Sequence, residues 1–236
     1  FINIKGYYYN NYIMSVSVPK FLFLEGNIGS GKSTFFKELQ KYFPNVKFIN
    51  EPVDTWESIV DENGNNMIQN YYKDKRKYAF SFQIMAYGTR VKLLFHELNK
   101  MLLNPTNNIK PHFICERSIY TDRNVFVKML CDENVITKQE KTIYDHLFMD
   151  DNFNKLSIKY LYVDTEPQLC YDRIKLRGRK GETIDLNYLE KCDAYHKKWF
   201  DGIPNEKIIR VSGKENFNDK SVMNKYVNQI KTFLNS

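Results

Sequence analysis

The sequence lacks the features that mark secreted, membrane-spanning and zinc-binding proteins. Its four cysteines form no CxxC pair, and no histidine stands at zinc-ligand spacing from Cys115, Cys131, Cys170 or Cys192. We therefore expect free thiols in a reducing compartment. No apolar run is long enough to span a membrane, residues 1–20 do not resemble a secretory signal, and no arginine precedes Arg76. We expect a cytoplasmic protein without a membrane partner, and a mitochondrial location stays open.

Long blocks of like charge, internal repeats and low-complexity linkers are also absent. The net charge of +7 comes from lysines interspersed with acids, as on an ordinary solvated surface, so we expect no nucleic-acid partner. With 236 residues, 42% of them hydrophobic, the chain has the size of one domain. We expect that domain at residues 20–236, behind a disordered tail of residues 1–19. Met14 stands just ahead of the first predicted strand, so deletion of residues 1–13 should leave activity intact.

A phosphate-binding loop follows the first apolar segment. Residues 21–24 are a short apolar run, and residues 26–33 then match the P-loop pattern GxxxxGK[ST] ahead of a helix-forming stretch. The glycines let several backbone N–H groups point inward at a helix N-terminus. Lys32 is expected to reach the β- and γ-phosphates, and Ser33 to hold Mg²⁺. The pattern predicts a nucleoside triphosphate site made of Gly26, Asn27, Ile28, Gly29, Ser30, Gly31, Lys32, Ser33 and Thr34.

Four further short apolar segments alternate with helical ones. They are residues 46–50, 112–116, 158–163 and 208–211, and the main helical stretches are 34–43, 75–103, two between 117 and 153, one running toward 173, 186–199 and 220–234. Uniformly apolar strands separated by helices predict a five-stranded parallel sheet covered on both faces. Ligands bind beyond the carboxyl ends of such strands. The P-loop, Glu51, Glu116, Arg117 and Asp164 stand at those ends.

These residues suit a kinase that phosphorylates a hydroxyl group. Such an enzyme needs a carboxylate to accept the proton, and Glu51 is the candidate base, with a helix cap as its alternative role. Glu116 is expected to hold the metal, and Arg117 to neutralise charge between donor and acceptor, unless it forms a structural ion pair. Lys32 and Arg117 join Glu51 as predicted catalytic residues.

Three arginines near residue 178 predict a lid. Arg173, Arg177 and Arg179 are expected to follow a helix, flank a glycine and close on the transferring phosphates, excluding water. A solvated basic loop is the alternative.

The chain resembles the deoxyribonucleoside kinase family, in the branch of deoxycytidine, deoxyguanosine and deoxyadenosine kinases. The resemblance runs from Phe21 to the C-terminus and rests on residues 25–34, Glu51-Pro52-Val53 with Trp56, Phe82-Gln83, Glu116-Arg117-Ser118 with Asp122-Arg123, and residues 173–179. It implies a P-loop kinase fold, a homodimer, and Mg²⁺-dependent transfer from ATP or another triphosphate to a nucleoside 5′-hydroxyl. It further implies that Glu51 and Arg117 meet the 5′-hydroxyl, that Tyr72 and Glu182 hold the 3′-hydroxyl, and that Ser33 and Glu116 serve the metal.

The same resemblance places residues around the base. It implies that Asp122 lies beside Arg90, near the exocyclic group of the base, and that the ring packs against Trp56, Tyr71, Phe82 and Phe126. Gln83, Ala86 and Arg90 share one helix face, and a glutamine amide can pair with the edge of cytosine or adenine. We therefore expect deoxycytidine, deoxyadenosine or deoxyguanosine as substrate rather than thymidine. Residues 213–217 resemble a loop that touches the donor base, with a plain turn before the last helix as the alternative.

Several alternatives remain open on the sequence alone. Gln83 and Arg90 could be exposed helix residues, and the enzyme could accept thymidine or all deoxynucleosides. A thymidylate-kinase-like monophosphate kinase shares the P-loop, the sheet and an arginine lid. A nucleic-acid-binding P-loop protein is suggested only by the basic charge.

Overall fold

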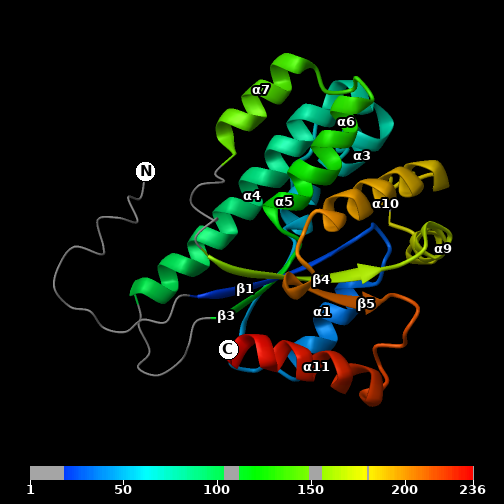
Figure 1. Cartoon of the computed structure of the whole chain (residues 1–236). Coiled ribbons are helices and arrows are strands. Elements are labelled where there is room, and N and C mark those ends of the chain that lie inside the picture. The colour runs from blue at the N-terminus through cyan, green and yellow to red at the C-terminus, as the bar shows by residue number, and fades with distance from the viewer. Residues whose placement is uncertain (1–18, 104–111, 149–155, 180, 236) are drawn as a thin grey trace.

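The centre of the molecule is a parallel sheet with the strand order β2-β3-β1-β4-β5 (Figure 1). The structure, a computed structural model, describes residues 19–103, 112–148, 156–179 and 181–235, so the tail expected at residues 1–19 lies almost entirely outside the described residues. All four strand pairings are parallel, which confirms the predicted sheet. The strands are β1 (Lys20–Gly26), β2 (Lys47–Ile49), β3 (His112–Glu116), β4 (Ser157–Asp164) and β5 (Ile208–Ser212).

The central strand β1 sets the register for the site. Its residues pair with β3 from Lys20 opposite His112 to Leu24 opposite Glu116, and with β4 on the other side. Helices cover both faces, so residues 21–26 are all buried and nearly all apolar. Glu25 is the one charged residue in that buried run.

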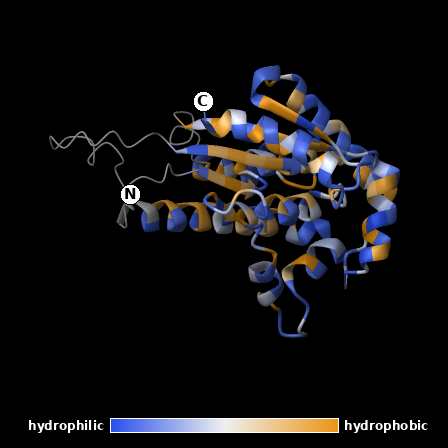
Figure 2. Cartoon of the chain, turned by 90° about the horizontal axis from the view of Figure 1, so that it is seen from below, coloured by the Kyte–Doolittle hydropathy of each residue, from blue (hydrophilic) through white to orange (hydrophobic). Residues whose placement is uncertain are grey.

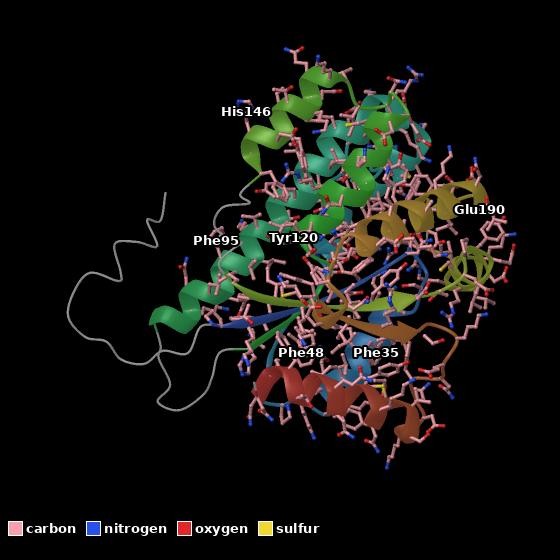
Figure 3. All side chains as sticks on the ribbon, viewed as in Figure 1. Phe35, Phe48, Phe95, Tyr120, His146 and Glu190 are labelled. Atoms are coloured by element: carbon pink, nitrogen blue, oxygen red, sulfur yellow. The ribbon has the colours of Figure 1, made fainter. Side chains whose placement is uncertain are left out.

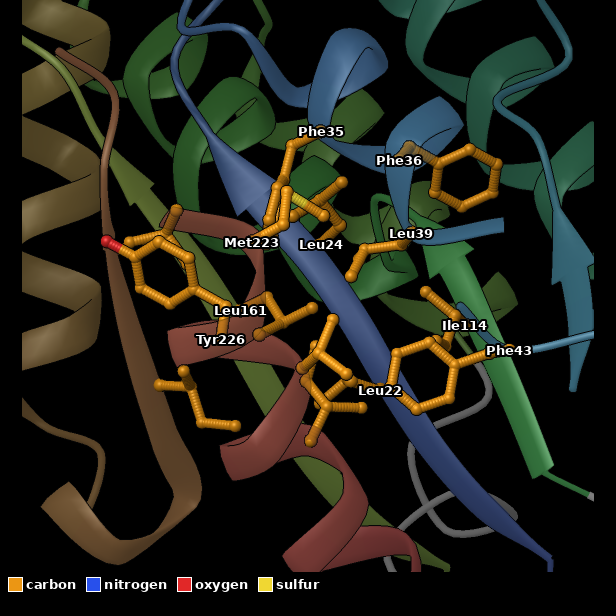
Figure 4. Packing of buried hydrophobic residues seen from close by; sticks show 14 of the residues in the cluster. Leu22, Leu24, Phe35, Phe36, Leu39, Phe43, Ile114, Leu161, Met223 and Tyr226 are labelled. Carbon is orange, nitrogen blue, oxygen red and sulfur yellow. The ribbon is translucent and has the colours of Figure 1, made fainter. Parts of the chain in front are cut away.

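Helices α1 (Lys32–Gln40) and α11 (Lys220–Asn235) cover one face of the sheet (Figure 1). Figure 4 shows how their apolar side chains meet those of the strands. The aromatic ring of Phe35 lies 4.7 Å from that of Phe217 and 5.6 Å from that of Tyr226. This cluster includes Leu22, Leu24, Phe36, Leu39, Ile114, Leu161, Met223 and Ile230.

The opposite face is covered by a larger group of helices (Figures 1 and 3). The longest is α4 (Lys75–Leu103), which the sequence predicted with the same bounds. The same group contains α5 (Ile119–Thr121), the π-helical turn η2 (Asp122–Val127), α6 (Lys128–Asp132), α7 (Lys138–Leu147) and α10 (Leu186–Asp201). In Figure 2 the strands run largely orange between helices whose outward turns carry hydrophilic residues, as expected for a buried sheet.

Four elements complete the fold. They are α2 (Val53–Ser58), α3 (Met67–Lys73), α9 (Pro167–Arg177) and the short 3₁₀ turn η3 (Asn205–Lys207). Helices α2 and α3 were not predicted from the sequence, and they are only 6 and 7 residues long. Helical structure expected up to residue 153 ends at Leu147 in the described part, and residues 149–155 lie outside it. No helix within the described ranges is long and apolar enough to cross a membrane, and all four cysteines are free.

Candidate active site

The P-loop connects β1 to α1 and depends on its glycines. Gly26, Gly29 and Gly31 all have positive φ angles, of 142°, 76° and 99°. A Cβ atom would lie 2.5 Å from the carbonyl oxygen of Val163 at Gly26, and 2.5 Å from that of Cys170 at Gly29. Side chains are therefore excluded on both steric and conformational grounds. Helix α1 begins without a side-chain cap, which leaves its first N–H groups available to an anion.

Lys32 is buried at the base of this loop. Its ammonium group donates hydrogen bonds to the carbonyl oxygens of Gly26, at 3.0 Å, and Asn27, at 2.5 Å. Burial, and then the nearby charge of Arg117, lower the pKa of Lys32 to about 7. A part of the Lys32 population is therefore neutral near pH 7, and a bound triphosphate would favour the charged form.

The P-loop is also held from the side by α9 and the strand ends. The Thr165 hydroxyl donates to the Ser30 carbonyl at 2.9 Å, and the Arg173 guanidinium donates to Ser30 at 3.0 Å and to Gly213 at 2.8 Å. The prediction that Arg173 and Arg177 follow a helix was wrong. Both lie within α9, which continues until Gly178 adopts a left-handed conformation at φ 59° and ends it.

A cluster of two carboxylates and two guanidinium groups stands where β2 and β3 end. Arg117 Nε lies 3.2 Å from Glu51 Oε1, and Arg90 donates both to Glu51 and to Asp122, the latter at 2.6 and 2.7 Å. Burial alone would raise the pKa of Glu51, but the charges of Arg117, Arg90 and Lys32 outweigh it and lower that pKa. Glu51 is thus an ionised carboxylate that caps no helix, because α2 has no side-chain cap.

A second pair of oxygen groups lies beside the P-loop. The Ser33 hydroxyl donates to Glu116 Oε1 at 2.6 Å, across 83 residues of sequence. A hydroxyl and a carboxylate are hard oxygen ligands of the type that Mg²⁺ prefers, and Mg²⁺ needs few protein ligands when it also binds phosphate. These two residues fit a magnesium ion, and the described residues contain no group of three or more His, Cys, Asp or Glu residues suited to a metal.

One cavity of about 840 Å³ runs from the P-loop to the middle of α4. It is lined by every predicted site residue except Gly26 and Asn27, namely Ile28, Gly29, Ser30, Gly31, Lys32, Ser33, Thr34, Glu51, Trp56, Tyr71, Tyr72, Phe82, Gln83, Arg90, Glu116, Arg117, Asp122, Phe126, Arg173, Arg177, Arg179 and Glu182. Residues from widely separated parts of the chain thus face a single space. Its size suits a nucleoside together with the phosphates of a nucleotide.

The far end of the cavity has aromatic walls and a few polar groups. The rings of Tyr71 and Phe82 stack with centroids 4.7 Å apart, and the Arg90 guanidinium lies 5.1 Å from the Trp56 ring. Gln83 is 2% exposed, and its amide oxygen has no hydrogen-bond partner among the described residues. The alternative that Gln83 and Arg90 are exposed is therefore wrong. A buried amide whose oxygen is unpaired, in an aromatic pocket, is suited to a planar polar ligand.

The remaining arginines of the predicted lid pair with acids at the rim. Arg177 donates to Glu182 at 2.5 Å, and Arg179 lies 3.8 Å from Glu182 and 3.5 Å from Glu57 on α2. The Glu182 side chain is 4% exposed. The alternative of a freely solvated basic loop does not describe these residues, because each arginine has an acidic partner.

Sequence reasoning missed several residues of this site. Tyr188 lines the cavity, and its hydroxyl contacts that of Tyr71 at 3.0 Å. In the sequence it is one residue of the predicted helix 186–199 and has no feature that points to a site. Thr165 supports the P-loop from a strand end, where only the neighbouring Asp164 drew notice. Glu25 had a visible signal, because a charged residue interrupts an apolar run. Val53, Ile68 and Asn218 also line the cavity, whereas its other lining residues 214–217 belong to the segment 213–217 that resembles a donor-base loop.

A parallel sheet, a P-loop at its carboxyl edge and a carboxylate–arginine cluster in the same cavity define a P-loop phosphotransferase. Comparison with known proteins makes the class specific. The chain belongs to the deoxynucleoside kinase family, whose model matches residues 22–235. It is therefore a phosphotransferase that acts on a deoxynucleoside.

Three relatives illustrate the similarity. The chain is 32% identical to a human deoxycytidine kinase, over 90% of this chain and 90% of the relative. It is 28% identical to a mitochondrial deoxyguanosine kinase of Xenopus laevis, over 91% of this chain and 89% of the relative. It is 31% identical to a probable deoxycytidine kinase of fowlpox virus, over 84% of this chain and 80% of the relative.

Proposed function

We propose that this enzyme transfers the γ-phosphate of ATP, or of another nucleoside triphosphate, to the 5′-hydroxyl of deoxycytidine, deoxyadenosine or deoxyguanosine in preference to thymidine. The observation that carries the base preference is the buried Asp122–Arg90 pair, which lines the same cavity as the unpaired amide of Gln83. A carboxylate can accept a hydrogen bond from the amino group of those bases. Opposite the O4 oxygen of thymine it would face another acceptor and leave a buried group unpaired.

The chemistry of transfer follows from the cluster at the strand ends. Glu51 is ionised and can accept the proton that leaves the 5′-hydroxyl. Arg117 stands next to it and can stabilise charge that develops between the acceptor oxygen and the γ-phosphate. Lys32 approaches the phosphates from the P-loop side, once it gives up its contacts with Gly26 and Asn27. Because such transition states are loose, a weakly basic carboxylate is sufficient.

Ser33 and Glu116 are the residues proposed to hold Mg²⁺. When bound there, the ion neutralises charge on the phosphate oxygens. Arg177 and Arg179 are proposed to turn toward the phosphates, whereas Tyr72 and Glu182 are proposed to bind the sugar 3′-hydroxyl. Tyr72 and Glu182 line the same cavity, as this role requires.

Three wider features belong to the same proposal. Residues 20–236 form the kinase domain, the protein acts in the cytoplasm, and it forms a homodimer. Ile143 and Leu147 on α7 are 45% and 50% exposed, and a second copy would remove this apolar surface from water. Light scattering on the purified protein would test the dimer directly.

A panel of acceptors tests the proposed function. ADP formation with ATP and Mg²⁺ is measured for the four deoxynucleosides and for their monophosphates, each as kcat/KM. We expect activity with deoxycytidine, deoxyadenosine or deoxyguanosine above that with thymidine, and none with monophosphates. Preference for thymidine would overturn the role given to Asp122. Activity on thymidylate alone would support the monophosphate kinase alternative.

A further inference from the structure

Glu25 is a fully buried acid in the middle of the molecule. It is 0% exposed, and it lies between the apolar part of β1 and the first glycine of the P-loop. Burial raises the pKa of Glu25, although hydrogen bonds from Ser118 and Thr121 and the charge of Arg117 oppose the rise. An apolar residue would suit this position better on grounds of burial alone. The acid therefore has a use other than filling the core.

The carboxylate of Glu25 holds the segment that follows β3. One of its oxygens accepts the backbone N–H of Ser118 at 2.9 Å, and the other accepts the hydroxyl of Thr121. Ser118 in turn accepts the N–H groups of Tyr120 and Thr121 with its side chain, which starts α5. A single side chain thus anchors both the residue that caps α5 and the last residue of α5.

The turn held in this way contains an unfavourable backbone conformation. Arg117 has a φ angle of 65°, in the left-handed region that side chains other than glycine rarely adopt. Its own N–H donates to the Leu24 carbonyl at 3.0 Å, and the next N–H along the chain donates to Glu25. Two consecutive amides of the turn are therefore fastened to two consecutive residues of β1. Backbone strain persists only where the surroundings enforce it.

The conformation decides where the guanidinium group lies. With this backbone, the Arg117 side chain lines the cavity with its Nε 3.2 Å from Glu51. We propose that Glu25 is a positioning residue for phosphate transfer, which fixes the turn at Arg117 and so holds the arginine beside Glu51. Because Glu25 directly precedes the P-loop, the same side chain sets the distance between donor loop and acceptor cluster. The inference rests on the proposed role of Arg117 in transfer.

Substitutions along β1 and α5 test this role. Glu25→Gln keeps the shape but weakens the anchor, and Thr121→Val removes one of its two bonds. Lys20→Met is the matched control at the other end of β1, because it removes hydrogen bonds to the carbonyls of Phe233 and Leu234 at the end of α11, and Lys20 is not among the residues that line the cavity. For each variant, kcat, the KM for ATP and Tm are measured.

We expect Glu25→Gln to lower kcat by roughly ten- to a hundredfold, since small displacements of a catalytic group have effects of this size. Thr121→Val should give a smaller loss, and the KM for ATP should stay within about twofold of wild type, because the P-loop keeps its other supports. Lys20→Met should lower Tm and leave kcat unchanged. If Glu25→Gln lowers Tm as Lys20→Met does but leaves kcat unchanged, the residue is only structural and the proposal fails.

A double-mutant cycle shows whether the effect passes through Arg117. In an Arg117→Ala background, Glu25→Gln should lower kcat by less than about twofold further, since the group that it positions is gone. The same ten- to hundredfold loss in that background would overturn the proposal.

The inference about Glu25 can be tested separately from the proposed function. Should the wild-type protein phosphorylate no deoxynucleoside, the proposed function fails, and the crystal structure of Glu25→Gln then decides the inference on its own. A changed φ angle at Arg117, with its guanidinium away from Glu51, supports positioning by Glu25. An unchanged turn contradicts it.

Discussion

Arg117 Nε lies 3.2 Å from Glu51 Oε1, so the predicted base is in direct contact with a predicted stabiliser of the phosphate. Arg90 contacts the same carboxylate from α4 while it also holds Asp122. Glu51 therefore connects the part of the cavity near the phosphates to the part near the base. A base set between two guanidinium groups stays ionised, and its proton-accepting strength is limited by them.

Glu51→Gln should lower kcat strongly. The amide retains the size of the side chain but cannot accept the proton of the 5′-hydroxyl, and general bases typically contribute roughly 10²- to 10⁴-fold. We expect a fall of kcat in that range, measured as ADP formation with the preferred deoxynucleoside at saturating ATP. Glu62→Gln, in the exposed loop before α3, is the control and should have wild-type turnover. Near-wild-type kcat for Glu51→Gln would remove this residue from the mechanism.

Asp122→Asn should shift the enzyme toward thymidine. Asparagine can donate a hydrogen bond to the O4 oxygen of thymine, where the carboxylate leaves a buried acceptor unpaired at a cost of about 1–3 kcal/mol. The ratio of kcat/KM for deoxycytidine to that for thymidine should therefore fall by roughly 5- to 150-fold. Asp132→Asn changes an exposed acid on α6 and should leave the ratio unaltered. An unchanged ratio for Asp122→Asn would show that the base is selected elsewhere.

The sequence predicted best those elements whose burial itself imposes a pattern of apolar residues. Buried parallel strands must be apolar on both faces, and the helix Lys75–Leu103 carries its apolar stripe along its whole length, so both could be predicted. The short helices α2 and α3 could not, since six or seven residues show less than two turns of periodicity. The helix that contains Arg173 was predicted to end too early, because basic residues alone do not reveal whether they lie in a loop or in a helix that contacts the carbonyls of Ser30 and Gly213.

Contacts between residues far apart in the sequence could not be predicted either. The Ser33–Glu116 pair joins residues 83 positions apart, and the sequence suggested a metal role for each residue without showing that their side chains are in contact. The left-handed turn at Arg117 has no sequence signal, because glycine is absent from it. The sequence therefore predicted which residues gather at the sheet edge but not the contacts that hold them.

ATP binding should take up protons near neutral pH. The pKa of Lys32 is about 7 in the unliganded protein, and the phosphates will raise it, so the fraction that is neutral must gain a proton on binding. We expect uptake of less than one proton per site at pH 7, and a larger uptake at pH 8, where more of Lys32 is neutral before ATP binds. Titration calorimetry of Mg·ATP in buffers of different ionisation enthalpy measures this number. Lys37→Met, on the exposed side of α1, should not alter it, and no uptake at pH 8 would contradict the assigned pKa.

His196 makes the folded state sensitive to acid. It is 0% exposed on α10, its Nδ1 lies 2.7 Å from the Cys192 carbonyl, and its Nε2 has no hydrogen-bond partner among the described residues. Its ring lies against those of Phe126 and Tyr162. Burial, and to a lesser extent the charge of Arg117, lower the pKa of His196 to about 3, so the ring is neutral in the folded protein.

Stability should consequently fall as pH drops below the pKa of an unfolded histidine, about 6.5. Between that value and the folded pKa of about 3, only the unfolded chain binds the proton at His196. The resulting contribution lowers the free energy of unfolding by about 1.4 kcal/mol for each pH unit. Other acids add their own pH dependence, so the quantity to measure is the difference between wild type and His196→Gln, by urea unfolding at pH 7, 6, 5 and 4. The difference should be constant above pH 7 and should move in favour of the variant below pH 6, because glutamine takes up no proton. Parallel curves would show that His196 is protonated in the folded state.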